Sequence, residues 1–162
     1  MKINLLKNLQ NEARESRYQF FNALVEENKL DYILTAHHQN DNHETFFFNA
    51  LKGNGIGSLK GIPERNGIIL RPLLQFTKTQ LLMHVQENKI KYGTDSSNLT
   101  SKYERNFIRN EVFQRLKIKF PKFEKGLTNS INFLNEDYLL LNQLIKELLK
   151  DQIEINAGNK MK

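Results

Sequence analysis

The spacing of apolar residues predicts a helix close to the start of the chain. Between residues 8 and 29, apolar side chains recur at intervals of three and four, as on one face of an α-helix, and Asn8 is placed to cap it. The stripe that we expect to be buried consists of Leu9, Ala13, Phe20, Phe21 and Leu24.

Two short apolar runs predict strands, with a helix between them. Residues 31–36 are too few and too uniformly apolar for a helix, which favours a buried strand. Residues 67–74 form a second such run, broken by Pro72. The pattern predicts a helix over residues 40–51. Its consecutive aromatic side chains are expected to fill the core, with stacking against a base as the alternative: Phe46, Phe47 and Phe48.

Two further helices are predicted in the second half of the chain. One covers residues 78–87 and is capped by Thr77. The other starts at residue 127 and carries an apolar seam of about three heptads. This helix either packs on the preceding domain, pairs with another helix or begins a second domain. The seam consists of Ile131, Leu134, Tyr138, Leu141, Ile145 and Leu148.

Length, charge and cysteine content narrow the class of protein. The 162 residues make one domain, or one domain and part of another, and they contain no cysteine, which excludes disulfides and thiolate chemistry. Residues 71–125 hold twelve basic and five acidic groups, so that segment is either a footprint for a phosphate backbone or a solvated helix surface. No apolar run reaches membrane-spanning or signal-peptide length, so we expect a cytoplasmic protein with no membrane partner.

The candidate chemistry is concentrated in residues 34–61. Two histidines, His37 and His38, follow the first strand, where open α/β sheets place ligand sites. Asp41 and Glu44 are three apart on the next helix, so their carboxylates project from one face. The glycine-rich loop that follows either lets its backbone approach a ligand or is a helix C-cap at Gly53 and a plain connection.

A second polar cluster lies about sixty residues later. Arg105 and Arg109 are four apart on a predicted helix and therefore share a face. Two forked donors on one face suit the recognition of phosphate or carboxylate. The alternative is that each simply pairs with Glu104 or Glu111.

The two clusters together resemble the tRNA(Ile)-lysidine synthetases, which are ATP-dependent ligases of the PP-loop family. The first run matches the family pattern His-His-x-Asp-Asp-Gln-x-Glu-Thr and the glycines after it, but Asn40, Asn42 and Lys52 stand where the family has aspartate, glutamine and arginine. Matching positions elsewhere include an early Arg and Tyr segment and the pattern Asp-x-Ser-Asn followed by Arg-Asn-x-Ile-Arg. The matching residues are Arg14, Arg17, Tyr18, His37, His38, Asp41, Glu44, Thr45, Gly53, Gly55, Gly61, Arg71, Tyr92, Asp95, Ser97, Asn98, Arg105, Asn106, Ile108 and Arg109.

The resemblance implies a fold and a division into domains. It implies a Rossmann-like α/β domain of the PP-loop (adenine nucleotide alpha hydrolase-like) type, present in part, followed by a helical segment. Residues 1–118 would be the C-terminal part of the catalytic domain, and residues 119–162 a helical linker and the start of a tRNA-contacting domain. The family's Ser-Gly-Gly-x-Asp-Ser loop for the ATP pyrophosphate does not occur in the sequence, so we expect an N-terminally truncated copy.

The resemblance also implies a reaction and its participants. The family uses ATP and Mg²⁺ to adenylate the carbon-2 oxygen of the wobble cytidine in tRNA(Ile) with a CAU anticodon, and free lysine then displaces AMP to give lysidine. The catalytic residues implied are His37, Asp41, Glu44 and Arg109, with Asp41 and Glu44 holding Mg²⁺ or the lysine amine. Arg109 would lie near these carboxylates, and a homodimer is possible. The substrate-binding residues implied are Lys52, Arg71, Arg105 and Asn106.

Three alternatives stay open. The chain is an inactive remnant that binds tRNA, or it belongs to another PP-loop enzyme that modifies tRNA, although the absence of cysteine speaks against persulfide or cluster chemistry. The third alternative is a zinc hydrolase using His37, His38, Asp41 and His43, whose spacing does not match a zinc pair four residues apart.

Overall fold

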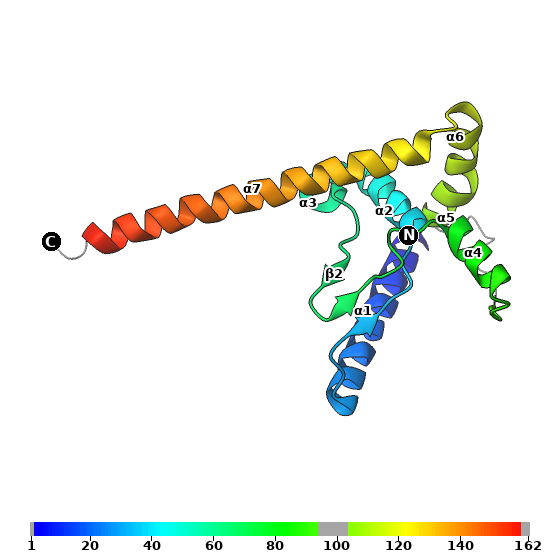
Figure 1. Ribbon diagram of the computed structural model, residues 1–162, viewed down its shortest axis with the longest axis horizontal. Helices are drawn as coiled ribbons and strands as arrows, with labels where there is room; N and C mark the ends of the chain where they lie inside the picture. The colour runs from blue at the N-terminus through cyan, green and yellow to red at the C-terminus, as the bar shows by residue number, and fades with distance from the viewer. Residues whose placement is uncertain (1, 94–103, 160–162) are drawn as a thin grey trace. The chain divides into compact units, whose positions relative to one another are not determined.

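The computed structural model describes residues 2–93 and 104–159, with the side chains of 2–11, 13, 14 and 151–159 left out. The chain forms two compact units (Figure 1). One consists of Met1–His37 and Glu64–Leu74, and the other of His38–Pro63 and Gln75–Lys162. Each unit is described separately below.

The first unit contains a long helix and a small sheet. Helix α1 (Lys2–Asn28) leads to strand β1 (Ile33–Leu34), and the strands β2 (Arg65–Asn66) and β3 (Ile69–Leu70) form a hairpin that turns at Gly67 with a φ of +60°. The sheet order is β1-β3-β2, in which β1 is parallel to β3 and β2 is antiparallel to it. The parallel pair has the crossover expected of an α/β fold.

The sheet is shorter and less buried than the sequence predicts. Each strand has two residues, and Leu34 is 68% exposed, so the prediction of a fully buried strand over residues 31–36 is wrong. Within the second run, Ile69 is buried, and the strand ends at Leu70, ahead of Pro72. Strand β2 was not predicted.

The first helix is confirmed, but its cap and part of its stripe are not. Because α1 begins at Lys2, Asn8 lies inside it and is not the N-cap. Phe20 is 60% exposed, whereas Phe21 and Leu24 are half-buried. The side chains of Leu9, Ala13 and Arg14 lie outside the described residues.

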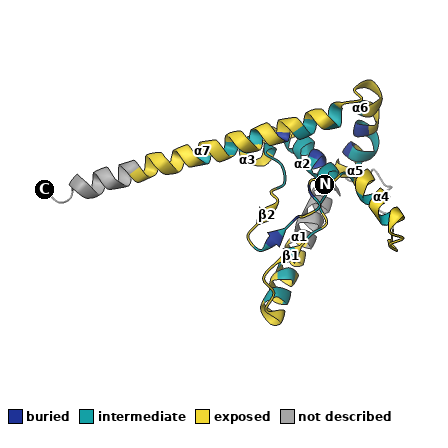
Figure 2. Cartoon of the chain, in the orientation of Figure 1, coloured by how far each residue is buried: buried dark blue, intermediate teal, exposed yellow. Residues whose placement is uncertain are grey.

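The second unit is helical, with a core of aromatic and branched side chains. Phe113 packs edge-on against Phe47 at 5.4 Å and against Phe123 at 5.2 Å between ring centroids. Ile108, Phe113 and Ile131 are buried. Figure 2 shows buried segments on α2 and near α6. The helices are α2 (Gln39–Leu51), α3 (Ile56–Leu59), α4 (Lys78–Glu87), α5 (Glu104–Phe107), η2 (Ile108–Val112), α6 (Phe113–Lys119) and α7 (Phe123–Asn159).

Local signals determine where α2 and α4 begin and end. Helix α4 has the predicted bounds and cap, with the Thr77 hydroxyl accepting from the Gln80 amide at 3.2 Å. At the end of α2, Gly53 has a φ of +69° and donates to the Ala50 carbonyl, and Asn54 donates to the Asn49 carbonyl, which is a Schellman cap. The C-cap interpretation of Gly53 is therefore confirmed, although the loop beyond it contains the short helix α3, which was not predicted.

A wide helical turn separates α5 from α6. Segment η2 is a π-helical turn, and the buried residues Ile108 and Phe113, which are 3% and 4% exposed, flank it five positions apart. In a regular α-helix, residues five apart point about 140° away from each other. The π-turn lets both side chains enter the core, which explains why a regular helix does not run through Arg109.

Helix α7 is covered along its first part only. It contacts α2, α3 and α6. Ile131 is 4% exposed, whereas Leu141, Ile145 and Leu148 of the same predicted seam are 48%, 46% and 65% exposed. The predicted domain boundary at residue 118 stays a prediction. Among the described residues, none of the helices combines the length and the apolar character that a bilayer-spanning segment needs.

Candidate functional site

The candidate site lies between α2 and the α5–η2 segment, which run in opposite directions. Three contacts follow one another along α2: Glu44 with Arg109, then Phe48 with Arg105, then Lys52 with Glu104. Glu44 and Phe48 are four apart on α2, and Arg105 and Arg109 are four apart on the facing segment. The predicted shared face of the two arginines is therefore used, and it is turned toward α2.

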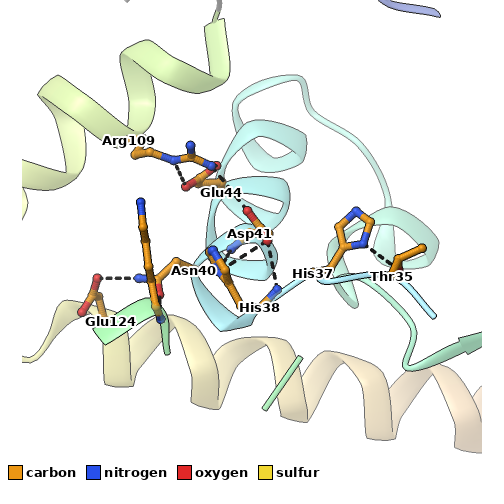
Figure 3. A network of polar contacts seen from close by, with 9 residues as sticks. Thr35, His37, His38, Asn40, Asp41, Glu44, Arg109 and Glu124 are labelled. Carbon is orange, nitrogen blue, oxygen red and sulfur yellow. Dashed lines mark hydrogen bonds and ion pairs between the residues drawn. The ribbon is translucent and has the colours of Figure 1, made fainter. Parts of the chain in front are cut away.

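Arg109 donates two hydrogen bonds to Glu44. Its Nε donates to Glu44 Oε1 at 2.6 Å and its Nη2 donates to Glu44 Oε2 at 2.8 Å, while Nη2 also lies 3.4 Å from Asp41 Oδ1 (Figure 3). The Glu44 side chain is only 4% exposed, and that of Arg109 is 30% exposed. Hydrogen bonding to Glu44 raises the pKa of the Arg109 guanidinium. The predicted convergence of these three side chains is confirmed, and their chemical roles stay predictions.

Asp41 also has a structural task at the start of α2. Its Oδ2 accepts from the His38 backbone amide at 2.9 Å, and the Asp41 amide donates to His38 Nδ1 at 3.4 Å. These reciprocal bonds form a capping box around the first turn. Because Nδ1 accepts, the neutral His38 ring carries its proton on Nε2.

Two cationic side chains lie against the ring of Phe48. The Lys52 ammonium lies 3.7 Å from the centroid of the ring, and the Arg105 guanidinium carbon lies 5.6 Å from it. Both distances suit cation–π attraction. Phe48 is half-buried and partly solvent-facing, while Phe47 packs on Phe113 as core. Phe48 is thus half-buried, as core filling predicts, and its ring in addition contacts two cations. Stacking of the ring on a base stays a prediction.

Two of the departures from the family pattern have a structural reason. Asn40 Oδ1 accepts from the Lys78 amide at 2.8 Å and Asn40 Nδ2 donates to Glu124 Oε1 at 3.3 Å, which ties α2 to α4 and α7. An aspartate lacks the donor that faces Glu124. Asn42 Oδ1 accepts from the Ile62 amide at 2.7 Å and fixes the end of the glycine-rich segment.

The other predicted site residues lie outside the cluster of Asp41, Glu44 and Arg109. His37 and Arg71 belong to the first unit, where His37 Nδ1 lies 3.0 Å from the Thr35 hydroxyl and Arg71 is 6% exposed. Asn106 is half-buried on α5. Asp95, Ser97 and Asn98 lie outside the described residues.

The site as it stands does not present free oxygens for a metal ion. Both Glu44 oxygens accept from Arg109, and no cluster of three or more His, Cys, Asp or Glu able to hold a metal occurs in residues 2–93 and 104–159. A magnesium ion on Asp41 and Glu44 would place a second cation beside Arg109. That assignment stays a prediction.

His43 is a buried group that the sequence suggested only as a zinc ligand. It is 1% exposed, and its Nε2 lies 2.8 Å from the Thr128 hydroxyl, which donates to the Glu124 carbonyl at 3.0 Å. Since the hydroxyl proton is used on that carbonyl, His43 donates from Nε2, and its Nδ1 has no partner in the described part of the chain. Burial lowers the pKa of His43 below the ordinary value of 6.5.

Comparisons with known proteins agree with the resemblance. A tRNA(Ile)-lysidine synthase from Chlorobaculum tepidum is 40% identical over 152 residues, covering 94% of this chain and 45% of that protein. Enzymes of the same name from Haemophilus influenzae and Bacteroides thetaiotaomicron are 35% and 38% identical, over 35% and 32% of their lengths. The chain thus spans less than half of these curated relatives.

A solved structure shows the same fold. The U34-tRNA thiolase NcsA from Methanococcus maripaludis, solved with its [4Fe-4S] cluster, superposes with a TM-score of 0.56 at 15% identity, over 76% of this chain and 43% of that one. The predicted PP-loop, adenine nucleotide alpha hydrolase-like fold is confirmed. A family model described as a PP-loop domain matches residues 2–116, and this chain therefore belongs to the PP-loop domain family.

Proposed function

We propose that this chain is part of a cytoplasmic tRNA(Ile)-lysidine synthase, which uses ATP and Mg²⁺ to join free lysine to the wobble cytidine of tRNA(Ile). The observation that carries the proposal is the meeting of Asp41, Glu44 and Arg109. Arg109 hydrogen-bonds to Glu44 although the two residues are 65 positions apart in the sequence. The similarity to lysidine synthases over 92% and 94% of the chain supports it.

The proposed roles follow from charge. The carboxylates of Asp41 and Glu44 receive a cation, either the lysine ammonium or Mg²⁺, and the Arg109 fork suits the phosphate of an adenylated cytidine. For His37 the resemblance implies a role in orienting the nucleotide, and for Arg71 a role in binding substrate. Mg²⁺, when bound, would supply further stabilisation of developing phosphate charge.

Lys52, Arg105 and Asn106 are proposed to contact the tRNA. The first two are exposed and are held on the Phe48 ring, so their charges are already positioned for a phosphate backbone. A phosphate contact of this kind makes binding weaker as salt increases, and each contact adds to the slope of affinity against salt concentration.

The first test measures AMP release from ATP by the purified chain, with tRNA(Ile) and lysine added together and singly. AMP that appears only when both substrates are present supports a ligase. Salt-dependent tRNA binding without AMP supports the alternative of a binding remnant. If the chain neither released AMP nor bound tRNA, the ligase and the binding remnant would both be excluded.

The second test addresses the tRNA contacts. We expect the double variant Lys52→Ala/Arg105→Ala to bind tRNA more weakly and to lower the log–log salt slope by roughly 1 to 2, the value for two lost phosphate contacts. Lys146→Ala, which removes an exposed charge outside residues 71–125, is the matched control. An equal loss in the control would show that net charge alone matters.

A further inference from the structure

Arg109 occupies the position in which the proposed function needs a substrate cation. Its guanidinium makes two hydrogen bonds to Glu44, at 2.6 and 2.8 Å, and approaches Asp41 at 3.4 Å. An ammonium group from lysine would have to bind the same oxygens. Both oxygens of Glu44 already accept from Arg109, and its side chain is only 4% exposed, which leaves little room for a second cation beside them. The protein's own side chain and the substrate therefore compete for one place.

Glu44 has to keep a positive partner at all times. Its side chain is 4% exposed, and a carboxylate buried to that extent without a counter-charge is strongly destabilising. Arg109 can therefore leave Glu44 only when another cation arrives. The replacement is an exchange between cations, because a simple opening would leave the carboxylate unpaired.

Arg109 is also placed to reach an anion. Its side chain is 30% exposed, in contrast to Glu44, so its guanidinium has a route to solvent. Arg105, one helical turn earlier, and Lys52 lie on the ring of Phe48, which is one turn along α2 from Glu44. An anionic ligand arriving beside this pair would be attracted by both charges and could accept the Arg109 fork in place of Glu44.

We propose that Arg109 is the resident counter-ion of the Asp41–Glu44 pair, and that it moves onto a phosphate-bearing ligand as a primary amine takes its place at the carboxylates. This inference rests on the proposed function for the identity of the two ligands. It makes their binding mutually favourable, because each ligand compensates the charge that the other displaces.

The exchange is tested by titrating L-lysine into the whole chain by calorimetry, with inorganic pyrophosphate present or replaced by sodium chloride at equal ionic strength. We expect pyrophosphate to increase the affinity for lysine by about 5- to 150-fold, the usual range of coupling between two sites, and lysine to increase the affinity for pyrophosphate by the same factor. An unchanged lysine affinity, or no lysine binding in either condition, would overturn the exchange.

A variant weakens the internal contact without removing its charge. Arg109→Lys keeps a cation for Glu44 but loses the bidentate fork. We expect it to bind lysine several-fold more tightly than the wild type when pyrophosphate is absent, and to show a smaller effect of pyrophosphate. Arg115→Lys, an exposed position on α6, is the control and should behave as the wild type. Thermal unfolding of both variants verifies that they are folded.

A spectroscopic measurement follows Arg109 directly. The ¹⁵N–¹H resonance of its Nε, assigned by its loss in Arg109→Lys, should shift when pyrophosphate and lysine are added together. A resonance that stays in place while lysine binds would contradict the exchange. The proposed function has separate tests in tRNA binding and AMP release, so it could survive that result.

Discussion

At the scale of single residues, His43 shows how a buried ring couples stability to pH. The unfolded chain takes up a proton near the ordinary pKa of 6.5, whereas burial lowers the pKa of the folded ring. Below pH 6.5 the unfolded state therefore binds more protons than the folded state, and the free energy of unfolding falls as the pH falls. Above pH 6.5 this contribution is fully retained.

The replacement His43→Gln tests that coupling. Glutamine keeps a donor toward Thr128 but cannot titrate, so we expect a cost of about 1–3 kcal/mol at neutral pH and a weaker loss of stability on acidification. Urea denaturation at a series of pH values measures both effects. His84→Gln, at an exposed position on α4, is the matched control and should cost no more than about 0.5 kcal/mol at neutral pH. The prediction would be contradicted if the free energy of unfolding changed equally with pH in His43→Gln and in the wild type.

Gly61 shows what the sequence could not reveal about the glycine-rich segment. It has a φ of +83°, and a Cβ there would lie 2.4 Å from Asn42 Oδ1 and 2.9 Å from Ile131 Cγ2. This glycine is required by the close approach of α2 and α7. The glycine spacing suggested a special backbone, but the neighbours that make it necessary come from distant parts of the chain.

At the scale of elements, Phe113 joins three helices. Its ring contacts Phe47 of α2 and Phe123 of α7 and is 4% exposed. We expect Phe113→Ala to lower the free energy of unfolding by about 3–5 kcal/mol, because it leaves a cavity in the core. Urea denaturation followed by circular dichroism measures the change.

The matched control is Phe120→Ala, at the end of the same helical segment. Phe120 is 57% exposed, and we expect its removal to change stability by no more than about 0.5 kcal/mol. Similar effects in the two variants would mean that the ring of Phe113 is not part of a continuous core.

Elements were predictable where their signals are local. Helix α4 was found with its bounds because Thr77 caps it, and the end of α2 was found because Gly53 caps it, whereas the capping box of His38 and Asp41 was not foreseen. The hairpin was missed because Arg65 and Asn66 carry no apolar alternation. The π-turn could not be predicted, because it depends on where Ile108 and Phe113 are buried.

At the scale of the whole molecule, residues 139–149 of α7 offer apolar surface to solvent. Leu144 and Leu148 are 47% and 65% exposed, so we expect the variant Leu144→Gln/Leu148→Gln to unfold within a few degrees of the wild type, since exposed substitutions change stability by roughly 0.5 kcal/mol or less. Its binding of the dye ANS should fall. Thermal unfolding and dye fluorescence measure the two effects.

Ile131→Ala provides the contrast on the same helix. Ile131 is 4% exposed, and its truncation should cost about 2–5 kcal/mol. If the leucine variant lost as much stability as this one, the leucines would have to be covered in solution by another surface, and a homodimer through α7 would become the first explanation to examine.

The π-turn at Ile108–Val112 has a consequence for how sequences of this kind are compared. Loss of one codon within it would place Ile108 and Phe113 four positions apart on an uninterrupted α-helix, about 40° from each other, so both would still face the core. A one-residue gap in an alignment at this point is therefore compatible with an unchanged core. The gap bears directly on Arg109, because the guanidinium that pairs with Glu44 lies inside the turn.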